Sequence, residues 1–229
     1  MTALKAPSPL ALLRETFTPV TFASLLASSP FLAAQQRGYG ETVLVWPGFG
    51  AGNASTTALR GYLNYLGYDA QGWSVGTNNG DVLRLLDELT AEVHRHADKG
   101  PVQLIGWSLG GYLAREVARD CPDQVQQVIT LGSPVVGGPK YTAVASAFAA
   151  RGESMDDIER QVLERYDNPL NVPVHAIYSK LDGVVAWQAC IDHRSPNVTH
   201  HEIASTHAGL GFSPAAYRII AQKLARQRR

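Results

Sequence analysis

The sequence is poor in charged residues, and neither sign of charge is in excess. Charged residues make up 17% of its 229 residues, and 20 basic residues balance 20 acidic ones. A nucleic-acid binder is therefore not expected, because such proteins cluster positive charge to neutralise phosphates. The 45% hydrophobic content excludes a disordered chain, and the length suits a single domain spanning residues 1–229.

Cysteine is scarce as well. Cys121 and Cys190 are the only two, too few for a disulfide scaffold and without the spacing of zinc ligands. We expect both to be buried small side chains in a reducing compartment, with a single bond between them as the open alternative. The sequence has no HExxH motif, carboxylate cluster or GK[ST] phosphate loop, so we expect no metal ion and no cofactor.

The sequence also lacks a compact hydrophobic run typical of a signal peptide or a membrane span. Residues 16–36 carry no charge over 21 positions, but Pro19 and Pro30 interrupt them and polar residues dilute their hydrophobicity. We expect residues 1–37 to form a helical extension packed on the core, with interfacial membrane contact as the less favoured alternative. A cytoplasmic location is the corresponding expectation.

From residue 42 onward, short runs rich in Val and Ile alternate with longer amphipathic segments. Strands separated by helices form βαβ units, so the alternation predicts an α/β fold with a mostly parallel central sheet and helices on both faces. The expected strands are 42–46, 102–107, 125–131 and 174–178, with weaker candidates at 68–73 and 198–203. The expected helices are 55–66, 81–96, 109–119 and 214–226.

One segment, at about 137–170, interrupts this alternation before the strand that should carry an acid loop. Ser154 is placed to cap a helix, with Asp157 three residues later. Met155, Ile158 and Val162 then share one face of that helix. The segment is either a small lid over a site or a longer crossover helix, and the sequence favours neither.

The sharpest local signal is Gly106-Trp107-Ser108-Leu109-Gly110, a G-x-S-x-G motif that follows a strand and opens a helix. An abrupt turn from strand to helix forces the central serine into a strained backbone conformation. The residues two positions away then come too close to tolerate side chains, and glycine supplies the room. Ser108 should project its hydroxyl at a helix N-terminus, where backbone N–H groups favour negative charge.

In this motif and in the order of the elements around it, the sequence resembles the α/β-hydrolase family of lipases and esterases. The family's triad runs serine, acid, histidine along the chain. The resemblance therefore implies Ser108 as nucleophile and Asp182, in the loop after a late strand, as the acid, with Asp192 in reserve. His207, in Ser205-Thr206-His207-Ala208-Gly209 before the last helix, matches the family's histidine.

The resemblance also implies an oxyanion hole made of two backbone N–H groups. One belongs to Leu109, the residue after the nucleophile. The other is expected from Phe49 in the turn Trp46-Pro47-Gly48-Phe49-Gly50, where proline replaces the histidine that the family commonly carries. The same glycine-rich turn evokes a dinucleotide site, but Asn53 or Ser55 stands where the third glycine is required.

The activity implied by the resemblance is hydrolysis of a carboxylic ester, by an esterase or lipase, through an acyl-serine intermediate. Trp46, Trp107 and Trp187 are expected to contact an apolar acyl or alcohol part of a small-molecule ester. A thioesterase, amidase or acyltransferase on the same triad is an open alternative, as is a non-catalytic binding protein of this fold. The oligomeric state does not follow from the sequence.

Overall fold

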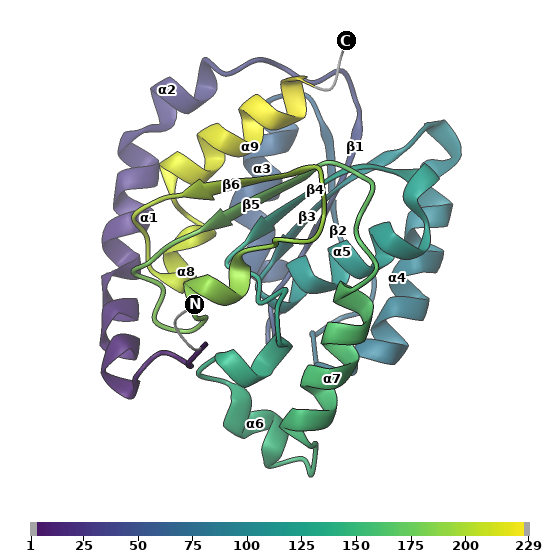
Figure 1. Ribbon diagram of the computed structural model, residues 1–229. Coiled ribbons are helices and arrows are strands. Elements are labelled where there is room, and N and C mark those ends of the chain that lie inside the picture. The colour runs from purple at the N-terminus through teal and green to yellow at the C-terminus, as the bar shows by residue number, and fades with distance from the viewer. Residues whose placement is uncertain (1–3, 227–229) are drawn as a thin grey trace.

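The computed structural model describes residues 4–226 and contains a six-stranded, fully parallel sheet. The strands lie in the order β2-β1-β3-β4-β5-β6 (Figure 1). Their bounds are β1 Thr42–Trp46, β2 Asp69–Gly72, β3 Val102–Trp107, β4 Val125–Leu131, β5 Val174–Tyr178 and β6 Val198–Glu202. The α/β fold with a parallel sheet is confirmed, including the two strands with the weaker sequence signal.

Helices cover both faces of the sheet, so both faces of each central strand are apolar. In β1, Val43 and Val45 pack toward α3 (Thr57–Tyr65) and α9 (Pro214–Arg226). Leu44, between them, packs toward α4 (Val82–His96) and α5 (Leu109–Asp120). Short 3₁₀ helices join several of these elements: η2 Asn53–Thr56, η3 Ala97–Lys99, η4 Pro122–Gln124 and η6 Trp187–Cys190.

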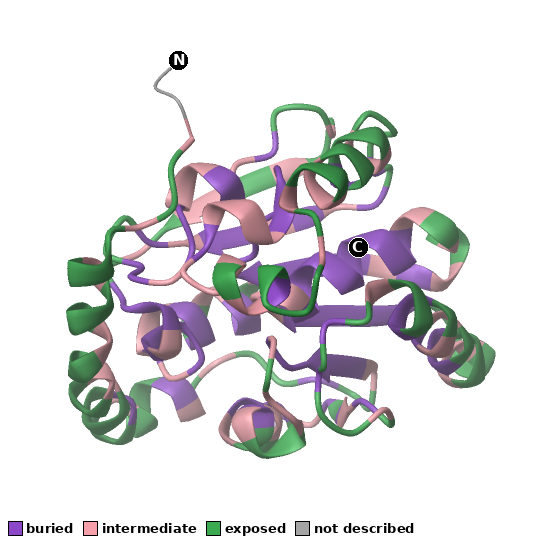
Figure 2. Cartoon of the chain, turned by 90° about the horizontal axis from the view of Figure 1, so that it is seen from below, coloured by how far each residue is buried: buried purple, intermediate pink, exposed green. Residues whose placement is uncertain are grey.

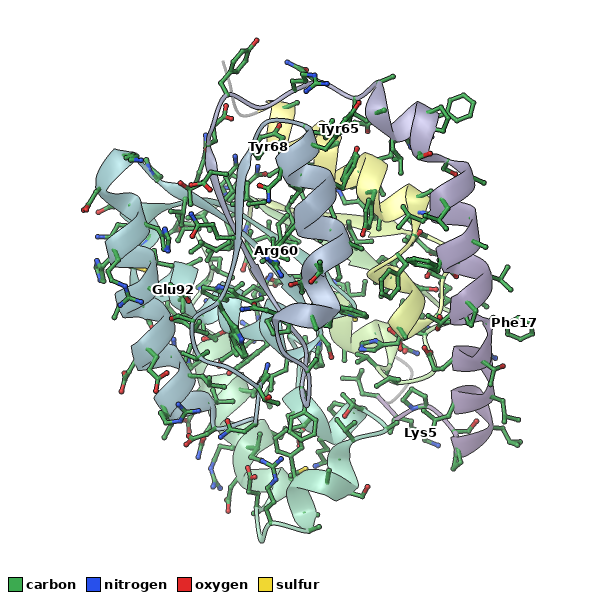
Figure 3. All side chains as sticks on the ribbon, turned by 180° about the vertical axis from the view of Figure 1, so that it is seen from behind. Lys5, Phe17, Arg60, Tyr65, Tyr68 and Glu92 are labelled. Atoms are coloured by element: carbon green, nitrogen blue, oxygen red, sulfur yellow. The ribbon has the colours of Figure 1, made fainter. Side chains whose placement is uncertain are left out.

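The N-terminal residues form a helical segment made of η1 (Pro9–Phe17), α1 (Thr18–Ala27) and α2 (Ser29–Ala33). Its inner side packs against α8 (His207–Leu210) and α9, where Leu25 and Leu32 are buried. Its outer side is exposed to solvent, and Phe17 points away from the sheet (Figures 2 and 3). By length and composition alone, Pro9–Ala27 would suffice to cross a membrane, with a mean hydropathy of 1.2.

The segment expected at about 137–170 folds as η5 (Gly138–Tyr141), α6 (Ala145–Ala149) and α7 (Met155–Tyr166), at the bottom of Figure 1. Ser154 caps α7, and its hydroxyl accepts the N–H of Asp157 at 3.3 Å. The ammonium of Lys140 lies 2.6 Å from one carboxylate oxygen of Asp156 and 2.6 Å from one of Glu159. These contacts fasten η5 to α7, and we call the unit from η5 to α7 the cap.

Candidate active site

Ser108 lies at the junction of β3 and α5 in a strained backbone conformation. Its φ of 53° and ψ of −122° make it the only non-glycine residue with a positive φ among residues 4–226. Such a conformation costs of the order of 1–3 kcal/mol and persists only where the surroundings fix it. Its N–H donates to the carbonyl of Leu131 at 2.8 Å, and this bond ties the turn to the end of β4.

The glycines around Ser108 are required by close backbone contacts. A Cβ on Gly106 would lie 2.3 Å from the carbonyl oxygen of Gly110. A Cβ on Gly110 would lie 2.5 Å from the carbonyl oxygens of Trp46 and Pro47 at the end of β1. Any side chain at either position would therefore force the strand-to-helix turn open, as the sequence motif predicts.

The structure brings Asp182 and His207 together from two different loops. Asp182 follows β5, and its Oδ2 lies 2.7 Å from Nδ1 of His207, the first residue of α8. The other oxygen, Oδ1, accepts the N–H groups of Val184 at 2.8 Å and Val185 at 2.7 Å. Both side chains are largely buried, so the carboxylate is fixed and only one of its oxygens faces the imidazole.

Asp192, the reserve acid, is engaged elsewhere. Its carboxylate forms a buried ion pair with Arg115 on α5 and accepts the N–H groups of Arg194 and Ser195. Burial alone would raise the pKa of Asp192, but the Arg115 guanidinium and these N–H groups hold that pKa well below its usual range. Asp192 therefore stabilises the packing of α5 against the loop before β6.

The turn after β1 lies against Ser108. A Cβ on Gly48 would lie 3.1 Å from the Cβ of Ser108. Phe49 and Leu109 line the same cavity as Ser108 and His207. Within residues 4–226, neither the N–H of Phe49 nor that of Leu109 donates a hydrogen bond to another group of the chain. The expectation that these two N–H groups form an oxyanion hole stays a prediction.

Asn78 holds this turn in place, and sequence analysis did not identify it. The side chain is fully buried, and its Nδ2 donates to the carbonyl of Pro47 at 3.0 Å. Its Oδ1 accepts the N–H of Gly80 at 3.2 Å, and its carbonyl accepts the N–H of Gly50 at 2.7 Å. The proline that replaces the family's usual histidine is therefore anchored through its carbonyl oxygen by an asparagine 31 positions later.

If the Phe49 N–H binds the reacting oxygen, Asn78→Ala should lower kcat by up to about 10²-fold with little change in KM, because a displaced turn carries this N–H away. Asn64→Ala is the matched control. Asn64 also makes two side-chain bonds to backbone, both to Ala70, and neither residue lines the cavity. Steady-state kinetics on a soluble ester measure the effect, and equal kcat values for the two variants would contradict this role of Asn78.

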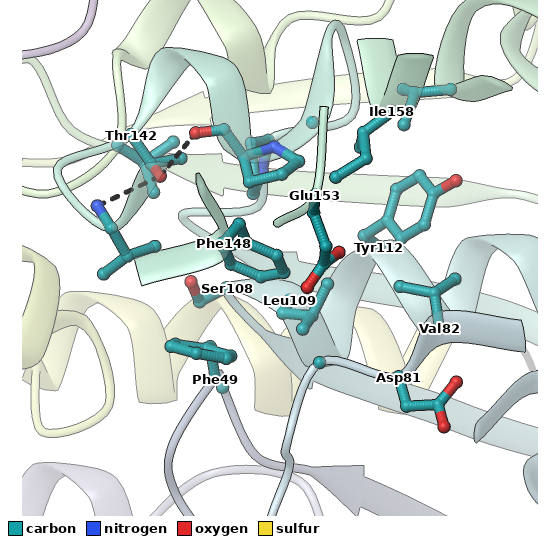
Figure 4. Close-up of a pocket in the computed structure, with 18 of the residues that line it drawn as sticks. Phe49, Asp81, Val82, Ser108, Leu109, Tyr112, Thr142, Phe148, Glu153 and Ile158 are labelled. Atoms are coloured by element: carbon teal, nitrogen blue, oxygen red, sulfur yellow. Dashed lines mark hydrogen bonds between the residues drawn. The ribbon is translucent and has the colours of Figure 1, made fainter. Parts of the chain in front are cut away.

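The cavity above Ser108 has a volume of about 700 Å³ and lies between the sheet edge and the cap. Its walls are mostly apolar, and the cap contributes Phe148, Ile158 and Val162. Figure 4 shows Phe148 and Ile158 at the cavity. Phe148 packs on Phe49 with ring centroids 4.8 Å apart, and the guanidinium of Arg151 lies 5.0 Å from the Phe49 ring. A volume of this size suits a small-molecule ligand with an extended apolar part.

Of the three tryptophans expected to contact substrate, the structure brings only Trp107 to the cavity. Trp46 is fully buried in the core between the sheet and helices α4 and α5, because it shares the strand face of Leu44. Trp187 stacks on Tyr178 at 5.9 Å, with the Lys180 ammonium 5.3 Å from its ring. The expectation for Trp46 was therefore wrong, and Trp187 lies outside the lining of this cavity.

Two further features that the sequence raised are the pair of cysteines and a possible metal site. Cys121 and Cys190 are both free thiols, and burial raises the pKa of Cys121 to about 11. Burial also raises the pKa of Cys190 well above its usual value. Between residues 4 and 226 there is no cluster of three or more His, Cys, Asp or Glu side chains that could hold a metal ion.

A model of the alpha/beta hydrolase family matches residues 12–227, nearly the whole chain. The chain belongs to this family. A curated relative, the pimeloyl-[acyl-carrier protein] methyl ester esterase of Sodalis glossinidius, is 28% identical over 142 residues. That match covers 54% of this chain and 52% of the relative, so it spans about half the length of each.

Solved structures of esterases and lipases share the fold of this alpha/beta hydrolase. The monoacylglycerol lipase of Paleococcus ferrophilus aligns with a TM-score of 0.65 at 15% identity, covering 83% of this chain and 97% of that one. Est1E from Butyrivibrio proteoclasticus gives a TM-score of 0.65 at 15% identity, covering 82% and 88%. At these identities the likeness shows a common fold.

Proposed function

We propose that this alpha/beta hydrolase is a serine hydrolase that cleaves carboxylic esters through an acyl-Ser108 intermediate. The observation that carries the proposal is the 2.7 Å contact between Asp182 and His207, beside a cavity that both His207 and the strained Ser108 line. Nucleophile, base and orienting acid are the parts that acyl transfer needs. The family membership and the esterase relative support the same reaction class.

In the proposed mechanism, Nε2 of His207 accepts the Ser108 proton while Oγ attacks the carbonyl carbon of the ester. Asp182 keeps the other imidazole proton on Nδ1 and stabilises the imidazolium that forms. The N–H groups of Phe49 and Leu109 bind the oxyanion of the tetrahedral intermediate. The imidazolium then protonates the departing alcohol, and water attacks the acyl-serine by the same route to release the acid.

The substrate class is proposed from the cavity. An apolar chamber of about 700 Å³ favours an ester with an extended apolar acyl or alcohol part. Two of the charged groups at the cavity, Arg151 and Glu153, belong to the cap and form a long ion pair of 4.0 Å with each other, whereas Asp81 precedes α4. The Sodalis glossinidius relative is named as a methyl ester esterase, which is consistent with a small alcohol leaving group.

Turnover of p-nitrophenyl esters of increasing chain length, compared with a matched thioester and a matched amide, tests this proposal. The expected result is ester cleavage with kcat/KM rising from acetyl to medium-length acyl groups, since each buried CH₂ contributes about 0.8 kcal/mol. Faster cleavage of the thioester or amide would favour the thioesterase or amidase alternative. No turnover of any of them, together with tight binding of an apolar acid, would favour a binding protein.

Whether the cap moves is tested by substituting its inner face. Ile158 and Val162 line the cavity, whereas Leu163 of the same helix is 39% exposed. If the cap opens onto a lipid surface, activity on a water-insoluble ester should jump once the ester forms an interface. Ile158→Ser with Val162→Ser should shrink that jump, because the opened face loses apolar area worth about 25 cal/mol per Å².

Leu163→Ser is the control for this experiment, since it removes a similar side chain from the solvent-facing side of α7. Short soluble esters should be cleaved at similar rates by all the variants. Saturation kinetics that pass smoothly through the solubility limit of the substrate would refute a moving lid and leave an esterase with a fixed cap.

A further inference from the structure

The carboxylate of Glu15 connects the N-terminal segment to the two loops that carry Asp182 and His207. Its Oε1 accepts the N–H of Gly183 at 3.0 Å and the N–H of His207 at 2.9 Å. Its Oε2 accepts the N–H of Ala208 at 2.8 Å. One side chain from η1 thus binds the residue after the acid, the histidine itself and the residue after the histidine.

We propose that Glu15 is a positioning residue that fixes the distance between Asp182 and His207. This inference rests on the proposed function, because it assigns Glu15 a role only if those two residues form part of a catalytic triad. Bonds to an ionised carboxylate are roughly twice as strong as bonds between neutral groups. Three of them on one half-buried group bind both loops at once. The loops are also joined by the N–H of Ser205, which donates to the Ser179 hydroxyl at 3.2 Å, and by the contact between Asp182 and His207.

Close backbone packing supports the same conclusion without reference to charge. A Cβ on Gly183 would lie 2.4 Å from the carbonyl oxygen of Ala11, one turn before Glu15. On the histidine side, the hydroxyls of Thr18 and Thr206 lie 3.1 Å apart. Glycine at position 183 therefore allows the acid loop to approach η1, and the threonine pair places α1 against the start of α8.

The geometry explains why a carboxylate suits this position. Three N–H groups converge on it, and an ionised carboxylate is acceptor-only, with two oxygens that can each take more than one donor. A glutamine would present an NH₂ group to at least one of these N–H donors. A 1 Å displacement of a catalytic group can cost about 10²-fold in rate, so loss of the carboxylate should act on kcat more than on substrate binding.

The experiment compares Glu15→Ala, Glu15→Gln and the control Arg14→Ala in the full chain, with p-nitrophenyl butyrate as substrate. Arg14 is the exposed neighbour of Glu15. Glu15→Ala should lower kcat by about 10- to 100-fold with KM changed less than about twofold. Glu15→Gln should fall between Glu15→Ala and the unmodified chain, and Arg14→Ala should match the unmodified chain.

A proton NMR measurement distinguishes a positioning role of Glu15 from a general loss of stability. The His207 Nδ1 proton shared with Asp182 should give a low-field proton NMR signal, assigned by its loss in Asp182→Asn. We expect that signal to broaden or move in Glu15→Gln and to stay in place in Arg14→Ala. If Glu15→Ala does not fold, Glu15→Gln decides the question through its kcat and this signal.

The outcomes also distinguish this inference from the function on which it rests. Unchanged kcat and an unchanged low-field signal in Glu15→Gln and in any folded Glu15→Ala, alongside an inactive Ser108→Ala, would overturn the role of Glu15 and leave the hydrolase intact. Equal losses in the Glu15 variants and Arg14→Ala would overturn it as well. Activity that survives in Ser108→Ala would instead overturn the proposed function.

Discussion

Ser108→Ala is expected to lower kcat/KM for p-nitrophenyl esters by about 10⁴-fold or more, because the attacking oxygen is removed while the rest of the site remains. The thermal unfolding transition should change little. Alanine and serine share the Cβ that must be accommodated at a φ of 53°, so the substitution adds no backbone strain.

The control for this variant is Ser55→Ala, which alters another serine of the same cavity. The hydroxyl of Ser55 donates to the carbonyl of Gly52 at 2.8 Å, a local bond outside the triad. Its removal should leave kcat within a few-fold of the unmodified chain. If Ser108→Ala lost its unfolding transition together with its activity, the serine would have a structural role.

Asp182→Asn should have the second large effect, a loss of about 10⁴-fold in kcat. The amide oxygen can still accept the N–H groups of Val184 and Val185, so the loop should keep its shape. The amide NH₂ then faces Nδ1 of His207 and donates to it. The imidazole must therefore carry its proton on Nε2, the tautomer that cannot accept the proton of Ser108.

Asp192→Asn should show the opposite pattern, with near-normal kcat in the folded fraction and a large loss of stability. Replacing one partner of a buried ion pair leaves the Arg115 charge uncompensated, which typically costs about 3–5 kcal/mol. The folded pKa of Asp192 lies below its unfolded value. Its contribution to the free energy of unfolding is therefore present above about pH 4 and declines as the pH falls below that.

Thermal or urea unfolding at several pH values measures this difference. The unmodified chain should lose stability on acidification more steeply than Asp192→Asn, whose position 192 no longer titrates. If Asp192→Asn abolished activity at full stability while Asp182→Asn was harmless, the acid of the triad would be Asp192.

The nucleophile turn could be predicted from the sequence because its cause is local. A Cβ on Gly106 would collide with the carbonyl oxygen of Gly110, four residues later, and this local contact leaves a short motif. The contact that requires glycine at position 110 is with Trp46 and Pro47 and is not local. The strands were predictable for a similar reason, since both faces of a parallel sheet are buried and its strands become continuous apolar runs. The candidate triad of Ser108, Asp182 and His207 came from the resemblance to the family and stays a prediction.

The position of Trp46 in its strand was enough to predict that its side chain points away from the cavity. Side chains alternate across a strand, so Trp46 must share the face of Leu44 and turn away from the cavity. Its position at the carboxyl end of β1 suggested proximity to the site, but proximity in the backbone does not determine where a side chain points. The same distinction applies to Trp187 in η6, which packs against Tyr178 at the end of β5.

Asn78 and Glu15 could not be predicted, because their contacts join residues that are distant in the chain. Asn78 reaches Pro47 across 31 positions, and Glu15 reaches His207 across 192. A side chain that bonds to a backbone N–H or C=O group does not require a particular residue type at the position it contacts. No sequence pattern therefore marks such a contact. Only the folded chain shows which N–H and C=O groups each side chain satisfies.

The central claim, an acyl intermediate on Ser108, is tested most directly by trapping that intermediate. The chain is mixed rapidly with excess p-nitrophenyl butyrate, quenched in acid and digested, and the peptides are analysed by mass spectrometry. The account predicts a burst of p-nitrophenol and a butyryl group on the peptide at Ser108, absent from Ser108→Ala. A butyryl group on another residue, or ester turnover with no acylated peptide under conditions where deacylation is slow, would contradict it.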